Sequence, residues 1–360
     1  MDWFMLGLLL VCVKAASIAP AGSFHKDYIS REGTTPVKGV FAVLIIFSHY
    51  IQYIAADGAW DGAYMALRSH LNQAVVIMFL FYSGFGMMES IGRKGVEYVK
   101  GIPRRRLLPL LIQFDVIVLI YFAMQLCLGR NYGLDRLPAA LVGWDGFGNS
   151  NWYVFGVLGE YVLMFAAFIG MDKWNGKGSK YVYAAVFTAL TAAFALAIRA
   201  SGRDDYWYNT LMMFPLGVWF SLLRRPVERL VMRSGGTYVL AALIAALAYL
   251  WSFDHRWGYG LKGYTLWAAM FAAVTVLLTM KIEFRSPVLN WFGDHVFGVY
   301  MLQRIPMILL SRAGWTQAHP YGCLVVTLLA TVCLAMAFEA AEKQILKKVK
   351  LKQTERGSLH

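Results

Sequence analysis

The hydrophobic residues of this chain gather in long, nearly uninterrupted runs that short polar loops separate. A helix needs about 20 apolar residues to cross the hydrocarbon core of a bilayer, and the runs approach or reach that length. The predicted spans cover residues 3–18, 37–55, 71–91, 107–128, 152–170, 181–200, 206–223, 237–252, 263–280, 289–310 and 321–341. This pattern predicts an all-α, polytopic membrane helix bundle with about eleven transmembrane helices, or about ten if residues 3–18 do not cross.

The overall composition agrees with the run pattern. Hydrophobic residues make up 59% of the 360 positions and charged residues only 15%, whereas about a quarter of the residues in an average soluble domain are charged. The net charge of +13 would suggest nucleic-acid binding in a soluble chain. In a membrane protein it is better explained by lysines and arginines that stay in cytoplasmic loops, so we expect no nucleic-acid partner.

Successive predicted loops are alternately rich and poor in lysine and arginine, and this alternation predicts how the chain is oriented in the membrane. Most of the 34 lysines and arginines fall on one side, notably in residues 93–106, 224–233 and 343–356. The positive-inside bias then places the carboxyl terminus and Lys38 on the cytoplasmic side. We expect an N-terminal transmembrane segment (1–26), one membrane-embedded domain (27–342) and a basic cytoplasmic tail (343–360). Because no loop is long enough for a soluble catalytic domain, any chemistry must use the helix bundle.

The span 37–55 carries the most informative polar residues. It opens with Lys38, and His49 follows eleven positions later, which is about 16 Å along a helix axis. A histidine at that depth is costly in a bilayer, and intramembrane ionisable residues are functional candidates by default. Other polar residues predicted to lie within spans are Ser83, Gln113, Asp115, Glu160, Gln303 and Arg304. For Gln113, Asp115 and Glu160, hydrogen bonding between helices is an equally good explanation.

The run Pro103–Pro109 concentrates positive charge in Arg104, Arg105 and Arg106. It has two explanations: an ordinary cytoplasmic anchor that fixes topology, or a site for a polyphosphate, because guanidinium groups pair bidentately with phosphate oxygens. The sequence contains no motif typical of nucleotide hydrolysis, dinucleotide redox chemistry or zinc hydrolysis. The cysteines, Cys12, Cys127, Cys323 and Cys333, lie in apolar runs without C-x-x-C spacing. We therefore expect neither disulfides nor a metal site.

Taken in order, these elements resemble the acyltransferase family 3 membrane proteins. The family opens its first core helix with a basic residue, usually arginine, followed by ten residues and a histidine; Lys38 and His49 have that spacing. Its other elements are similar to Phe79–Gly84, Pro103–Pro109, Asn151–Val154 and Leu289–Gln303. Three positions depart from the family pattern. Lys38 stands where the family usually has arginine, Pro103 stands where it has the first arginine of R-x-x-R, and Gln303 stands where many members have histidine.

The resemblance implies a multipass O-acyltransferase of the plasma (inner) membrane. The donor would be a cytoplasmic acyl-CoA, most simply acetyl-CoA, and the acceptor a sugar hydroxyl of a surface glycan or lipid-linked sugar. His49 would act as general base or as a transient acyl carrier, which the sequence does not separate. The donor's phosphates would bind Lys38, Arg104, Arg105 and Arg106. Residues predicted to position the substrates are Ser83, Trp152, Tyr153 and Glu160.

Two other classes of protein stay open. A transporter or flippase for a lipid-linked or anionic sugar would use the same charged residues without chemistry, and inverted repeats or broken spans would favour it. The sequence shows no internal repeat, although Pro215 and Pro306 interrupt two predicted spans. A structural or assembly subunit would leave His49 unexplained. Saturable acyl-CoA binding that depends on the arginine run would favour the enzyme.

Overall fold

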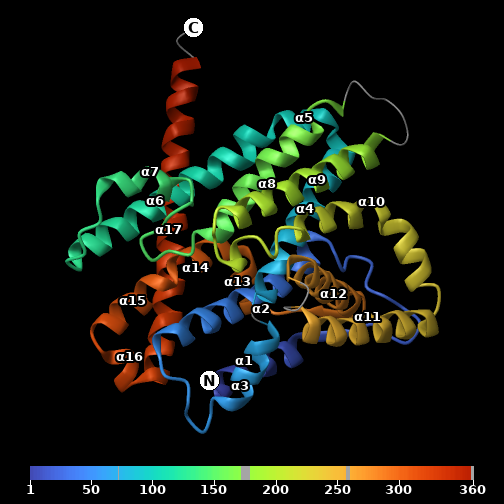
Figure 1. The fold of residues 1–360 in the computed structure, drawn as a ribbon, viewed down its shortest axis with the longest axis horizontal. Helices are drawn as coiled ribbons and strands as arrows, with labels where there is room; N and C mark the ends of the chain where they lie inside the picture. The colour runs from blue at the N-terminus through green and yellow to red at the C-terminus, as the bar shows by residue number, and fades with distance from the viewer. Residues whose placement is uncertain (72, 172–178, 257–259, 358–360) are drawn as a thin grey trace. The chain divides into compact units, whose positions relative to one another are not determined.

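The structure is a computed structural model that describes residues 1–71, 73–171, 179–256 and 260–357, with side chains as far as Gln344. Helices dominate it (Figure 1), and the only strands in these residues are the short β1 (Ala16–Ile18) and β2 (Ile282–Phe284). The predicted all-α fold class is confirmed. Lys173 and Lys177, which contributed to the predicted charge bias, lie outside the described residues.

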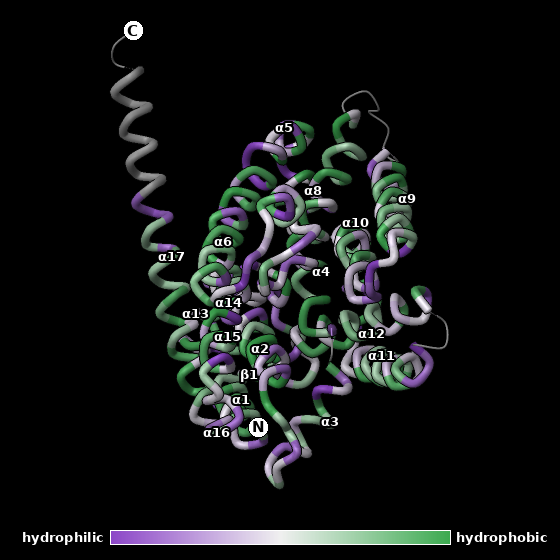
Figure 2. The backbone as a smooth tube through the Cα atoms, turned by 60° about the vertical axis from the view of Figure 1, so that its left-hand side comes forward, coloured by the Kyte–Doolittle hydropathy of each residue, from purple (hydrophilic) through white to green (hydrophobic). Residues whose placement is uncertain are grey.

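Long apolar helical segments occur where most of the spans were predicted. By length and composition, the described residues contain 7 segments able to cross a bilayer. These are Arg31–Tyr53, Gly62–Lys94, Pro103–Cys127, Ser179–Ala200, Gly235–His255, Gly260–Lys281 and Pro320–Gln344. Their tubes are predominantly green in the hydropathy colouring (Figure 2). Each of them overlaps one predicted span.

The remaining predicted spans form other kinds of helix. Helix α1 (Asp2–Ala15) has 14 residues, about 21 Å at helical rise, which is less than a hydrocarbon core of about 30 Å. Helix α8 (Trp152–Phe168) is apolar but has 17 residues. The span predicted at 206–223 instead begins with the turn η5 (Asp205–Trp207) and becomes helix α10 only at Met213–Val231. Pro215 is tolerated in α10 because it lies in the first turn, where the backbone N–H groups have no helical partner.

The predicted span 289–310 is not one continuous helix. It forms three short helices, α13 (Pro287–Asp294), α14 (Val296–Leu302) and α15 (Arg304–Arg312). Pro306 explains the second break, because its missing N–H leaves the carbonyl of Leu302 without an intrahelical donor. The break places Gln303 between α14 and α15.

One compact unit comprises Met1–Val11, Thr35–Met65 and Ser286–His360. It contains most of α2 (Arg31–Tyr50), together with α13, α14, α15, α16 (Trp315–Ala318) and α17 (Pro320–Gly357). Glycines allow α2 and α13 to touch backbone to backbone. A Cβ atom at Gly39 would lie 1.9 Å from the Leu289 carbonyl oxygen, and one at Gly293 would lie 1.9 Å from that of Thr35. Only glycine permits this approach at either position.

The other compact unit comprises Cys12–Thr34 and Ala66–Arg285. Besides α8 and α10 its main helices are α4 (Ala74–Lys94), α6 (Leu108–Cys127), α9 (Ser179–Ala200), α11 (Gly235–His255) and α12 (Gly260–Lys281). Short elements complete it: α3 (Gly62–Leu71), which begins in the first unit, α5 (Val96–Lys100), η2 (Pro103–Leu107), η3 (Leu134–Arg136) and α7 (Leu137–Leu141). Strands β1 and β2 pair antiparallel, with Ala16 opposite Phe284. Helix α10 packs on both α4 and α9.

Several helices expose the apolar faces expected of contact with lipid. Leu119 of α6, Leu247 of α11 and Leu329 of α17 are 47%, 66% and 63% exposed. In water such faces would be costly, whereas against lipid chains they need no protein cover. The chain is therefore built as a polytopic membrane protein.

Candidate active site

His49 lies in the last turn of α2, which Ser30 caps. The Ser30 hydroxyl accepts a hydrogen bond from the Gly33 N–H at 3.0 Å, and the run from Val37 to Phe47 supplies the apolar face. Because α2 runs continuously from Arg31 to Tyr50, Lys38 and His49 are separated by about 16 Å along its axis, as the spacing predicts. Both side chains are partly buried.

Residues from the broken segment α14–α15 surround the His49 ring within the first unit. The ring centroids of His49 and Tyr300 are 6.0 Å apart. Gln303 and Arg304 are close enough to the imidazole to act on it electrostatically, and Gln303 Oε1 has no hydrogen-bond partner among the described residues. The Gln303 amide is itself oriented, because its Nε2 donates to the Tyr300 carbonyl at 2.9 Å. The helix break thus brings polar groups close to the histidine.

Arg304 is held by residues that follow α2 directly. Its guanidinium donates to Gln52 Oε1 at 2.9 Å and to the Tyr53 hydroxyl at 3.2 Å. Tyr50 fixes the end of α2 in turn, since its hydroxyl donates to the Pro320 carbonyl at 2.5 Å. The residues that follow α2 are therefore joined to the start of α15 by the hydrogen bonds of Arg304, close to His49.

The His49 ring retains one unengaged nitrogen. Its Nδ1 is buried and has no hydrogen-bond partner among the described residues. In the tautomer protonated at Nε2, Nδ1 carries a free lone pair. Such a nitrogen is able to accept a proton from a hydroxyl group or to attack an acyl carbon. The catalytic role of His49 stays a prediction.

The predicted phosphate-binding arginines lie in the second unit. Arg104, Arg105 and Arg106 occupy the π-helical turn η2 ahead of α6, and all three side chains are exposed. Exposure suits both explanations given by the sequence, a topology anchor and an anion site. Their role stays a prediction.

The residues predicted to position the substrates also lie in the second unit. Ser83 is partly buried on α4, and Trp152 packs edge-on against Tyr153 at 5.9 Å at the start of α8. Glu160 is fully buried, and its Oε2 accepts a hydrogen bond from Thr191 at 2.8 Å. This bond links α8 to α9, as expected of a residue that holds helices together. The role of these four side chains in positioning a substrate stays a prediction.

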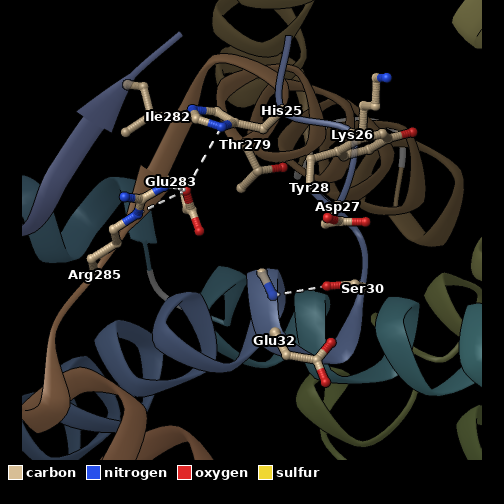
Figure 3. A pocket seen from close by; sticks show the side chains of 11 residues that line it. His25, Lys26, Asp27, Tyr28, Ser30, Glu32, Thr279, Ile282, Glu283 and Arg285 are labelled. Carbon is tan, nitrogen blue, oxygen red and sulfur yellow. Dashed lines mark hydrogen bonds and ion pairs between the residues drawn. The ribbon is translucent and has the colours of Figure 1, made fainter.

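Two features of the structure had no counterpart in the predicted site. Gln303 and Arg304 were recognised as intramembrane polar residues but given no place beside His49, because nothing in the sequence brings residues 49 and 303 together. The second is a cavity of about 530 Å³ in the second unit (Figure 3). There Glu283 lies 3.7 Å from His25 and accepts two hydrogen bonds from Arg285. Pairing of β1 with β2 creates this cluster, and strands of 3 residues give almost no sequence signal.

Residues 37–339 match the acyltransferase family 3 model, which describes an acyltransferase domain. The chain belongs to this family. The match covers nearly the whole chain and contains Lys38, His49 and all the other predicted site residues. The predicted family is thereby confirmed, and so is the coarser function of the protein as a membrane acyltransferase. Searches of curated proteins and of solved structures found no match.

Proposed function

We propose that this acyltransferase moves an acetyl group from cytoplasmic acetyl-CoA to a sugar hydroxyl of a surface glycan, with His49 as general base. The observation that carries the proposal is the unengaged Nδ1 of His49 beside Gln303 and Arg304, within the region that matches the family. The donor and the acceptor come from the resemblance of the sequence motifs. The plasma membrane as location and a cytoplasmic carboxyl terminus belong to the same proposal.

The chemistry needs one proton to move twice. His49 Nδ1 takes the proton of the sugar hydroxyl as its oxygen attacks the thioester carbonyl carbon, which gives a tetrahedral oxyanion and an imidazolium. Collapse of this intermediate breaks the carbon–sulfur bond. The CoA thiolate then receives the proton from His49, so an ester and a free thiol are formed and the imidazole is neutral again.

Neighbouring residues support these steps. The Gln303 amide lies beside the ring, and its Oε1, which has no partner in the described residues, is free to accept a hydrogen bond from a substrate. The Arg304 guanidinium would supply positive charge where the oxyanion develops. Lys38, about 16 Å along α2 towards the proposed cytoplasmic side, is assigned to a phosphate of the donor. Arg104, Arg105 and Arg106 are assigned to donor phosphates from their sequence motif alone. The proposal includes no metal.

An acyl-histidine route uses the same nitrogen differently. Nδ1 would attack the thioester directly, release CoA, and pass the acetyl group to the sugar in a second step. The two routes differ in whether CoA release requires the acceptor. Single-turnover release of CoA without acceptor, equal in amount to the protein, would support the acyl-histidine route.

A transporter of an anionic sugar is the second candidate, and the broken segment α13–α15 is the observation that favours it. Discontinuous spans line the substrate sites of many transporters. Membership of an acyltransferase family weighs against it. The two candidates differ in whether the protein turns over the donor.

Replacement of His49 by glutamine tests the enzyme. Purified protein in liposomes would be given acetyl-CoA and a glycan acceptor, and free CoA thiol and esterified sugar would both be measured. We expect His49→Gln to lower turnover by about 10²–10⁴-fold, the usual contribution of a general base. The control is His319→Gln, which changes an exposed histidine near the start of α17. Wild-type turnover in a folded His49→Gln protein would refute the role of His49, and absence of turnover in the wild type would favour transport.

A further inference from the structure

A second and larger cavity opens in the second unit where α4, α9 and α10 come together. Its volume is about 820 Å³, within the range of about 300–1,000 Å³ typical of small-molecule sites. Three different helices contribute cations to its lining. They are Arg93 from α4, Lys180 from α9, and Arg224, Arg225 and Arg229 from α10. Neither the predicted site nor the family match assigns a role to this cavity.

The acidic residues in the lining are already engaged. Glu89 accepts a hydrogen bond from the Ser221 hydroxyl at 2.7 Å. Glu228 accepts one from Arg224 Nε at 2.7 Å and one from the Tyr28 hydroxyl at 3.0 Å. Burial and the neighbouring Glu228 carboxylate raise the pKa of Tyr28, so this hydroxyl stays protonated and keeps donating. The acids are therefore held by partners of their own.

The other four basic side chains of the lining have no acidic partner among the described residues that line the cavity. No hydrogen bond or ion pair joins Arg93, Lys180, Arg225 or Arg229 to an acidic side chain in the described residues. Like charges around one hollow repel each other, and an anion bound between them would offset that repulsion. Arginines that serve only as a topology anchor need no such hollow.

The rim of the cavity adds an aromatic surface. Tyr181 lines the cavity and stacks on Trp219 with ring centroids 6.3 Å apart, and the Lys180 ammonium lies 5.3 Å from the centre of the Tyr181 ring. Guanidinium groups match phosphate oxygens in planar, bidentate pairs, whereas a carboxylate ligand would use fewer of these donors. The cation set and the flanking ring therefore suit a phosphate ester better than a simple anion.

We propose that this cavity is a binding site for a phosphate-bearing ligand. The phosphate would be held by Arg93, Arg225 and Arg229, with Lys180 at the rim. Two sources share this chemistry: a soluble phosphate ester of the nucleotide type and the headgroup of an anionic phospholipid. The proposal goes beyond the proposed acyl transfer and does not depend on it.

A charge-matched pair of double variants tests the site. Arg225→Gln/Arg229→Gln removes two cations of α10 from the cavity. Lys94→Gln/Arg233→Gln removes two exposed cations outside the lining, one at the end of α4 and one shortly after α10. The full-length protein would be purified, stripped of lipid in detergent, and titrated calorimetrically with 3′,5′-ADP and with inorganic phosphate. Binding of phosphatidylglycerol and of phosphatidylcholine would be compared by native mass spectrometry.

The cavity variant is expected to bind the phosphate probe at least about tenfold more weakly than the wild type, because each lost charged hydrogen bond is worth roughly a factor of ten. The control variant is expected to bind as the wild type does. Loss of 3′,5′-ADP binding identifies a soluble ester, and loss of phosphatidylglycerol binding alone identifies a lipid headgroup. Equal weakening in both double variants, or no saturable binding of any anionic probe to the wild type, would overturn the proposal.

Glu89→Gln gives an independent test if the cavity variant does not fold. The glutamine amide oxygen still accepts from Ser221, but the negative charge in the lining is gone. Affinity for the same anionic probe should then rise several-fold relative to the wild type. Unchanged or weaker affinity would contradict a phosphate site at this position.

Discussion

At the scale of single residues, the proposed chemistry depends on side chains whose neighbours come from distant parts of the sequence. His49 was found from its type, its spacing from Lys38 and its depth in an apolar run. Its companions Gln303 and Arg304 could not be placed, because only the fold brings residues 49 and 304 into one cluster. Sequence patterns of period 3.6 report which face of a helix is apolar, but not which helix that face meets.

For Glu160 the sequence allows two roles, positioning of a substrate or hydrogen bonding between helices, and two substitutions distinguish them. Thr191→Val would leave both carboxyl oxygens of Glu160 without a partner, because Oε1 already has none among the described residues. We expect a loss of about 1–3 kcal/mol of stability, seen as a thermal unfolding midpoint lowered by several degrees in detergent. Glu160→Gln keeps an acceptor for Thr191 and should preserve both stability and turnover.

The opposite pattern would give Glu160 a role with substrate. A Glu160→Gln protein as stable as the wild type but with much slower acyl transfer would show that the carboxyl group itself is needed. Thr191→Val serves as the matched control, since it removes the hydrogen bond between the helices but leaves the carboxyl group of Glu160 in place. Measuring stability and turnover on the same preparations separates the two interpretations.

Asp145 provides a pH-dependent contact in residues 129–151, the loop between the predicted spans 107–128 and 152–170. The bias of basic residues predicts that this loop lies outside. The Arg136 guanidinium donates to both carboxyl oxygens, at 2.6 and 2.7 Å, and holds the pKa of Asp145 below its usual range. A carboxyl group with a lowered pKa stabilises the fold fully above its unfolded pKa of about 3.9 and loses that contribution as the pH falls through the folded value. The pair is partly exposed, so the effect should be small.

The expected result is a shallow decline of the unfolding midpoint of the wild type below about pH 4, in addition to the general acid effect. Asp145→Asn removes the titrating group, so the decline of its midpoint over the same range should be smaller than that of the wild type. Scanning calorimetry of both proteins at a series of pH values gives the difference. Identical pH profiles for the two proteins would contradict a stabilising ion pair.

At the scale of helices, close packing depends on particular glycines. A Cβ atom at Gly84 of α4 would lie 2.0 Å from the Phe214 carbonyl oxygen, and one at Gly217 of α10 would lie 2.0 Å from that of Phe81. Each helix therefore offers a glycine to the backbone of the other. Gly84 follows Ser83 in the element that resembles a family motif, and the structure gives this glycine a packing role that does not depend on chemistry.

Substitution of two nearby glycines tests this packing. Gly84→Ala should destabilise the protein by about 1–3 kcal/mol, because the backbones of α4 and α10 must separate to admit a methyl group. Gly86→Ala on the same helix meets nothing within 4 Å and should be neutral or stabilising by up to about 1 kcal/mol, owing to the better helix propensity of alanine. Thermal unfolding in detergent measures both. Equal effects of the two substitutions would show that α4 and α10 do not pack at Gly84.

Helix existence was far more predictable than helix continuity. Seven predicted spans coincide with long apolar helices, because a run of about 20 apolar residues has few other stable structures in a membrane. The span predicted at 289–310 is broken, although most of its residues are apolar. Hydropathy averages over a window and is insensitive to a single missing N–H such as that of Pro306. The residues at the break, Gln303 and Arg304, lie close to His49.

At the scale of the whole molecule, the two compact units divide the predicted site residues. Lys38 and His49 belong to the first unit, and the arginine turn η2 belongs to the second. Sequence order does not reveal this division, since segments 1–11, 35–65 and 286–360 of the first unit are separated by the second. The proposed transfer of an acetyl group from a cytoplasmic donor to an outer acceptor requires the orientation in the membrane that the basic residues predict.

Orientation is open to a direct test with single cysteines. In a protein whose four cysteines are replaced by serine, Asn131→Cys places a thiol in the predicted outer loop and Arg233→Cys places one in a predicted cytoplasmic segment. Both positions are exposed. In intact cells a membrane-impermeant maleimide should label the cysteine at 131 at once, and the one at 233 only after permeabilisation, because lysine- and arginine-rich segments stay inside. The reverse pattern would place Lys38 and the basic cavity outside, where the proposed acyl-CoA donor is absent.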